Sequence, residues 1–330
     1  MSISAASRIA RQRGREARSV AQAPHLVVLG DLVLDIVARA DVMVEQASDV
    51  AGTVRFRAGG SAANTARSFV SAGGRATFIG AVGRDAWARR LVAAARAEGV
   101  TIHAVPVARP TGRIMVLLGP DGERSFVVDR GAADLLEATD IDAAWFRRCD
   151  VLHLPGYSLF RRPLADAAAG AVAIAHERGA AVSVDLSSRA PLLAMGRRQA
   201  WRVLAELRPT ILFGNSGEVA ALTGERQEER LLQVVPILVV KEGAAGCRVL
   251  GRSDDGADVL RLTVATVSIT ARDTTGAGDA FDAGFLYSLS AAAKGEALPR
   301  DAGSLRRAAV AGHRAAATVL RGPRIELADR

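Results

Sequence analysis

The stretch that decides the fold is DTTGAGDAF, residues 273–281. The Val-, Thr- and Ile-rich segment 262–269 before it predicts a strand, and the residues after it predict a helix. Gly276, Ala277 and Gly278 are therefore expected at the helix N-terminus. There, backbone N–H groups without intrahelical partners and the positive end of the helix dipole favour an anion, and small side chains let a phosphate approach closely.

Asp279 in the same stretch is a poor phosphate ligand, because a carboxylate repels a bound phosphate. It makes chemical sense as the group that accepts a proton from an attacking hydroxyl. The alternative is a plain strand-to-helix connection, with glycines for the turn and Asp for the helix dipole. A dinucleotide fingerprint does not fit, because Phe281 stands where the third glycine is needed, and no Gly-Lys-Ser/Thr is present for a Walker A loop.

A second stretch, AGGSAANTA over residues 58–66, places two glycines before a helix of small residues. Gly59 and Gly60 would let the backbone approach a polyhydroxyl ligand, and Asn64 can both donate to and accept from vicinal hydroxyls. The two stretches, in this order, resemble the signatures of the ribokinase-like (PfkB) carbohydrate kinase family. FIGAVGRD, residues 78–85, resembles the usual continuation of the first signature.

The resemblance implies roles for residues on the acceptor side of the site. Asp35 would hold sugar hydroxyls, because an ionised carboxylate accepts hydrogen bonds from neighbouring OH groups. Gly59, Gly60 and Asn64 would orient the same acceptor. A turn or helix-capping aspartate is the alternative for Asp35.

The resemblance also implies a nucleotide side. Asn215 and Glu218, after the apolar segment 211–213, would organise Mg²⁺ and the phosphates, with Glu218 acting through water. The alternative for this pair is a helix start with a surface acid. Further residues implied to border ATP or a monovalent cation are Lys241, Gly243, Gly246 and His313 for the nucleotide, and Asp273 and Thr275 for the cation, with potassium dependence left open.

The pattern of short Val/Ile/Leu runs alternating with Ala/Arg-rich stretches indicates an α/β fold with a mostly parallel sheet. By resemblance this is a ribokinase-like three-layer α/β/α core. The predicted strands lie near 25–30, 76–81, 150–154, 181–185, 210–213, 236–241, 246–250 and 259–267, and the predicted helices near 61–73, 85–98, 164–178, 216–223, 279–292 and 303–320.

Two segments break the helical rhythm. Residues 50–57 alternate, and residues 112–119 meet 124–128 through the turn 120–123, so both read as β-ribbons. By resemblance, segments near 36–58 and 108–130 form a small β-sheet lid over the sugar site, and such a lid is often a homodimer surface. Extra edge strands on the main sheet are the alternative.

The chain has 330 residues and a net charge of +8. Lys241 and Lys294 are its only lysines, and the arginines are spread over many predicted helices, so no nucleic-acid partner is expected. Residues 1–24 are rich in arginine and are expected to form a disordered basic tail, with an organelle address as the alternative, while residues 25–330 form the kinase core. With no membrane-length apolar run and no secretory segment, we expect a cytoplasmic protein without a membrane partner.

The two cysteines and five histidines show no zinc or disulfide spacing. Taken over the whole chain, the resemblance to the PfkB family implies a kinase that transfers the γ-phosphoryl group of ATP, with Mg²⁺, to a hydroxyl of a sugar or sugar-like substrate. A nucleoside kinase of the adenosine type is one alternative, and a catalytically idle sugar-binding regulator is another. No motif identifies the acceptor.

Overall fold

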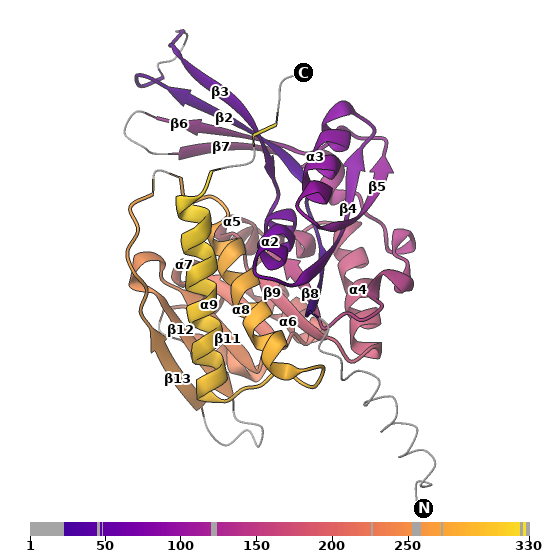
Figure 1. The fold of residues 1–330 in the computed structure, drawn as a ribbon, viewed down its shortest axis with the longest axis vertical. Coiled ribbons are helices and arrows are strands. Elements are labelled where there is room, and N and C mark those ends of the chain that lie inside the picture. Colours follow the sequence, from indigo (N-terminus) through magenta and orange to yellow (C-terminus); the bar gives the residue numbers. More distant parts are fainter. Residues whose placement is uncertain are drawn as a thin grey trace, which may run out of the picture.

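The computed structural model describes residues 23–44, 47, 49–119, 124–225, 227–252, 259–271, 273–323 and 326–327. These residues form a three-layer α/β/α core, with a separate small sheet above one end of it (Figure 1). The predicted α/β class is therefore confirmed.

The central sheet has nine strands in the order β13-β12-β11-β10-β9-β8-β1-β4-β5. Neighbours from β11 to β5 run parallel, whereas β12 pairs antiparallel with both β11 and β13. The carboxyl ends of the parallel strands therefore meet at one edge, where ligands bind in open α/β sheets. The strands are β1 His25–Leu29, β4 Arg75–Gly83, β5 Thr101–Val107, β8 Val151–Pro155, β9 Ala181–Asp185, β10 Ile211–Asn215, β11 Ile237–Lys241, β12 Cys247–Arg252 and β13 Val259–Val264.

Alternation along the buried strands builds two cores, one on each face of the sheet. In β1, Leu26 and Val28 join one cluster, while Val27 and Leu29 join the other. The first face is covered by α2 Ser61–Ser71, α3 Ala86–Ala97, α8 Ala277–Ala293 and α9 Ala302–Arg321, and the second by α4 Leu164–Glu177, α5 Arg189–Met195, α6 Arg197–Leu207 and α7 Ser216–Thr223.

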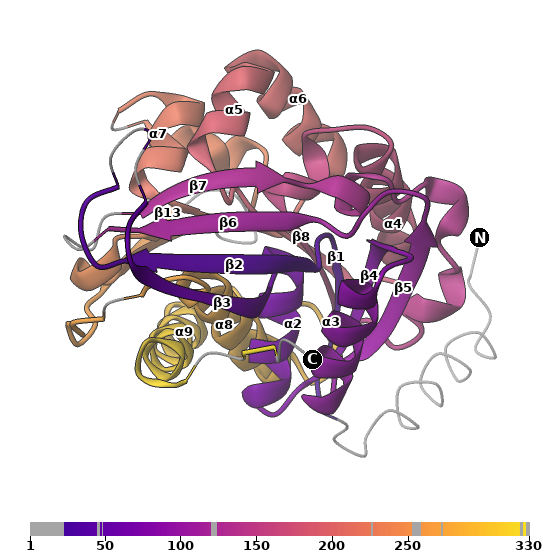
Figure 2. The same cartoon turned by 90° about the horizontal axis from the view of Figure 1, so that it is seen from above.

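The small sheet has the order β3-β2-β6-β7, with β2 and β6 parallel and the two outer pairs antiparallel. Its strands are β2 Val33–Ala40, β3 Gly52–Gly59, β6 Arg113–Leu118 and β7 Arg124–Asp129. Seen from above, β3 lies over α2, α8 and α9 (Figure 2). The predicted ribbons are confirmed as a sheet of their own, and the alternative of edge strands on the main sheet is wrong. The turn 120–123 lies outside the described residues.

The other predicted strands and helices are confirmed within a few residues, with one correction. The strand expected over 262–269 ends at Val264, because that residue pairs with Cys247, the first residue of the one strand that neighbours β13 in the described part of the chain. Residues 265–271 have no regular structure. β5, α5 and α6 were not predicted. Among the described residues, every helix is too short or too polar to traverse a bilayer, and residues 1–22 of the expected tail lie outside this description.

Candidate active site

The turn before α8 is shaped by Gly276, which takes φ +75° as the N-cap residue of that helix. Positive φ is the region that glycine enters without a steric cost. The predicted helix start at 276–278 is confirmed, with one change to the expected anion site. The N–H of Ala277 already donates to the carbonyl of Thr274 at 3.2 Å. Within the described chain, the N–H groups of Gly276 and Gly278 donate to no backbone carbonyl and remain for an anion.

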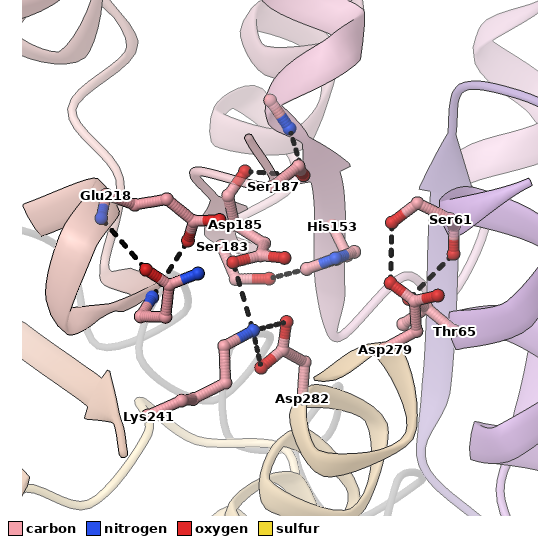
Figure 3. A network of polar contacts seen from close by, with 12 residues as sticks. Ser61, Thr65, His153, Ser183, Asp185, Ser187, Glu218, Lys241, Asp279 and Asp282 are labelled. Atoms are coloured by element: carbon pink, nitrogen blue, oxygen red, sulfur yellow. Dashed lines mark hydrogen bonds and ion pairs between the residues drawn. The ribbon is translucent and has the colours of Figure 1, made fainter. Parts of the chain in front are cut away.

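Asp279 lies in the first turn of α8 and is held by two hydrogen bonds from α2. Ser61 donates its hydroxyl to Oδ1 at 2.6 Å (Figure 3). Asn64 donates its amide to Oδ2 at 2.9 Å. Burial raises the pKa of Asp279 to about 6, and the two donated hydrogen bonds oppose this rise. The carboxylate is therefore ionised at neutral pH and yet basic enough to accept a proton.

Asp35 projects from β2 next to Gly59 of β3. An added Cβ at Gly59 would lie 2.3 Å from an oxygen of that carboxylate, so no side chain fits there. Gly60 takes φ +103° and lies against the backbone of Asp31. It is the N-cap residue of α2, so the helix begins directly after this turn. Burial, and next the nearby carboxylate of Asp31, raise the pKa of Asp35 to about 7.

A cavity of about 840 Å³ opens beside these residues. It is lined by Asp35, Asn64 and Gly276, so the sequence-predicted acceptor side and the α8 turn share one space. Asn64 lies in this lining and also contacts Asp279, to which its amide nitrogen donates. Its Oδ1 accepts a hydrogen bond from Arg67.

Lys241 ends β11, and its ammonium lies between two carboxylates (Figure 3). It is 3.1 Å from Asp185 at the end of β9 and 3.1 Å from Asp282 in α8. Burial disfavours the charged lysine, but the two carboxylates outweigh this effect and raise its pKa. An added Cβ at Gly278 would be 3.4 Å from Nζ, so a fixed positive charge lies beside the α8 turn.

Asn215 and Glu218 form a capping box at the start of α7. The Asn215 side chain accepts from the Glu218 N–H at 2.9 Å, and Glu218 accepts from the Asn215 N–H at 2.8 Å. Glu218 is buried rather than the surface acid of the alternative reading, and burial, followed by the charge of Asp185, raises its pKa to about 6. Two carboxylates that repel each other suit a hard divalent cation with oxygen ligands. The described residues hold no cluster of three His, Cys, Asp or Glu side chains that could ligate a metal ion.

The remaining nucleotide residues lie around the β11–β12 turn. Gly243 and Gly246 both take positive φ, and Gly246 packs against the carbonyl of Val264. His313 of α9 hydrogen-bonds the same carbonyl at 3.2 Å and packs edge-on against Phe281. None of these three predicted residues is part of the cavity lining, although Ala311 and Arg314 on either side of His313 are.

The expected cation residues have an unexpected neighbour. One Asp273 oxygen accepts from the Thr275 N–H at 2.9 Å, and the other accepts from the Arg57 guanidinium of β3 at 2.9 Å. The carboxylate of Asp273 is thus paired with a guanidinium group, and its role as a ligand for a monovalent cation stays a prediction.

Sequence reasoning missed several residues of the site. Ser61 lies inside the quoted AGGSAANTA stretch but received no role, because a serine at a helix start reads as ordinary. Asp185 carried a usable signal, since it ends a buried strand as Lys241 does, and the carboxyl ends of parallel strands converge. The other missed residues are Asp282, Arg57 and Arg67.

The fold and this site are those of a kinase, with buried carboxylates and a helix N-terminus next to a cavity. The model of the pfkB family of carbohydrate kinases matches residues 23–324, and the chain belongs to this family. It is accordingly a phosphotransferase of the sugar or nucleoside kinase type.

Known relatives agree with this assignment. A probable fructokinase-5 of Arabidopsis thaliana is 28% identical over 305 residues, covering 88% of this chain and 89% of the relative. The structure of an adenosine kinase from Sinorhizobium meliloti superposes with a TM-score of 0.74 at 26% identity, covering 92% of this chain and 96% of the other. A fructokinase from Vibrio cholerae O395 shares the fold, with a TM-score of 0.70 at 23% identity and coverage of 91% and 93%.

Proposed function

We propose that this protein uses ATP and Mg²⁺ to phosphorylate a hydroxyl group of a sugar-like acceptor bound between Asp35 and Asp279. The observation that carries the proposal is the buried Asp279 carboxylate, fixed by Ser61 and Asn64 at the first turn of α8. The relatives that are named as fructokinases support a sugar acceptor.

Asp279 acts as the general base. Its raised pKa keeps proton affinity close to the working pH, and its two hydrogen bonds fix the carboxylate toward one hydroxyl. Asp35, with Gly59 and Gly60 beside it, accepts hydrogen bonds from the neighbouring hydroxyls and orients the acceptor.

The transferred phosphoryl group lies at the α8 turn. The free N–H groups of Gly276 and Gly278 donate to its oxygens, and the ammonium of Lys241 adds a fixed positive charge. Glu218 would hold Mg²⁺ through water, and the ion would supply charge neutralisation on the phosphates when bound. We propose no potassium-dependent step, because the carboxylate of Asp273 already forms a salt bridge with Arg57.

The adenosine kinase relative keeps a nucleoside acceptor as the second candidate, because the cavity volume also suits a ligand larger than one sugar ring. A catalytically idle sugar-binding regulator is disfavoured, since Asp279 and the Gly276–Gly278 turn are both in place. The test is ADP release with ATP and Mg²⁺ against a panel of sugars and nucleosides. Turnover with a nucleoside alone would replace the sugar assignment, and no turnover with any acceptor would contradict the kinase.

The small sheet also has a role in the proposal, as a lid and a homodimer surface. Cross-strand register places Val54, Met115 and Val127 on the face opposite to Asp35, and all three are exposed. An exposed apolar sheet face of this kind is typical of a protein contact, and we assign it to a second copy of the chain. Light scattering in solution tests this, and a monomer at micromolar concentration would contradict it.

A further inference from the structure

The wall of the acceptor cavity is rich in arginine, which the binding of a neutral sugar does not require. Among the described residues, the charged side chains that line it are five guanidinium groups and three carboxylates: Arg39, Arg55, Arg57, Arg67 and Arg314, and Asp35, Glu98 and Asp273. Arginine is the residue that binds carboxylate and phosphate through two parallel hydrogen bonds.

Two of these arginines flank the residues assigned to the acceptor. Arg57 of β3 lies directly across from Asp35 of β2 in the sheet register. Arg67 follows Asn64 by one turn of α2 and hydrogen-bonds its side-chain oxygen. Asp35, Asn64 and the two arginines all line the same cavity, so an acceptor that contacts Asp35 and Asn64 shares this space with both guanidinium groups.

Both guanidinium groups keep unused donors. Arg67 is bound to Glu98, the Ala58 carbonyl and Asn64, but its Nη1 is buried without a hydrogen-bond partner. Arg57 is bound to Asp273, but its Nε is likewise buried and unpaired. An unpaired buried donor costs about 1–3 kcal/mol, more when it is charged, so both side chains gain if a small shift turns one of these nitrogens toward an acceptor in the cavity that they line.

A hydroxyl group satisfies such donors less well than an anion, because a hydroxyl must also find an acceptor for its own proton. Carboxylate and phosphate oxygens only accept when ionised. Burial also lowers the pKa of Arg67, because the guanidinium group is poorly solvated, and the nearby carboxylates, Glu98 first, oppose this shift.

We propose that the acceptor carries an anionic group, a carboxylate or a phosphate, that Arg57 and Arg67 bind beside the hydroxyl groups held by Asp35. The substrate class is thereby a sugar acid or a sugar phosphate. This inference rests on the proposed kinase function, and it narrows the acceptor of that same site.

The test compares matched neutral and anionic probes: D-fructose with D-fructose 6-phosphate, and D-glucitol with D-gluconate. Turnover of each is followed as ADP release, and binding is followed by calorimetry without ATP. We expect at least one anionic probe to exceed its neutral partner by about tenfold or more in kcat/KM and in affinity, and the phosphate and carboxylate pairs decide between the two sources of charge. Neutral probes equal to or better than both anions would overturn the inference.

Arg57→Gln and Arg67→Lys locate the effect. Each should lower the anionic-to-neutral ratio about tenfold, and the ratio cancels any general loss of turnover. Arg261→Gln is the matched control, because Arg261 is an exposed, ion-paired arginine of β13 outside the cavity. A preference that survives both cavity variants contradicts the assignment. If no probe is phosphorylated, the kinase proposal fails, while the calorimetric comparison still decides whether the cavity prefers anions.

Discussion

Removal of the Ser61 hydroxyl tests how its hydrogen bond sets the pKa of the Asp279 carboxyl group. Ser61 donates to Asp279 at 2.6 Å, and this hydrogen bond stabilises the ionised form. A hydrogen bond to a charged group contributes about 1.5–3 kcal/mol, and part of it is recovered when water replaces the hydroxyl. Ser61→Ala should therefore raise the pKa of Asp279, which is about 6 in the native protein, by about one pH unit.

The raised pKa should change how activity depends on pH. A general base works only when deprotonated, so activity falls as pH drops through its pKa. With the pKa raised by about one, the ionised fraction at pH 8 barely changes, while at pH 5.5 it falls about eightfold relative to wild type. The variant should look almost normal at pH 8 and severely impaired at pH 5.5.

The assay is the pH dependence of kcat at saturating ATP and acceptor for wild type and variant. Titration of Asp35 or of ATP is common to both proteins and cancels in the comparison. Thr65→Val is the matched control, because Thr65 donates to the Ser61 carbonyl and does not touch the carboxylate (Figure 3). An acid limb that stays in place in Ser61→Ala would refute the assignment of that limb to Asp279.

Three further predictions concern other parts of the site. Asp35→Ala should weaken acceptor use by about 2–5 kcal/mol in kcat/KM while ATP affinity stays nearly constant, and equal losses for both ligands in a titration would make Asp35 structural. Gly278→Val should lower kcat more than it weakens ATP binding, because a branched side chain beside Lys241 blocks the phosphoryl position; a folded variant with unchanged kcat would remove the anion-binding role. Lys241→Met should cost about 3–5 kcal/mol of unfolding free energy in denaturant, because it leaves the buried carboxyl group of Asp282 without its partner, and adding Asp282→Asn should restore part of it; no recovery would contradict this prediction.

Most of the fold could be predicted from the sequence, because the apolar residues of its strands and amphipathic helices recur at regular intervals. β5 escaped prediction because Pro106 interrupts an edge strand, and the helices α5 and α6 escaped because Pro191 and Gly196 break a short segment. Those residues signal turns more strongly than they signal regular structure.

The candidate site was predictable where neighbouring residues form a local motif, as at Gly276 and Asp279. It was not predictable where charges meet across the fold. Arg57 and Asp273 are separated by 216 residues, and Lys241 meets Asp185 across the intervening strand β10. Partners of this kind depend on strand order and register, which no single stretch of sequence specifies.

The most direct test of the account is the turnover of Asp279→Asn measured together with its ATP affinity. Asparagine keeps the size of the side chain but cannot take a proton. We expect the variant to fold, to bind ATP as the wild type does, and to release ADP in the presence of acceptor about 10²–10⁴ times more slowly, the usual loss for a missing general base. Turnover near that of the wild type, with normal ATP binding, would contradict the central claim that Asp279 activates the acceptor hydroxyl.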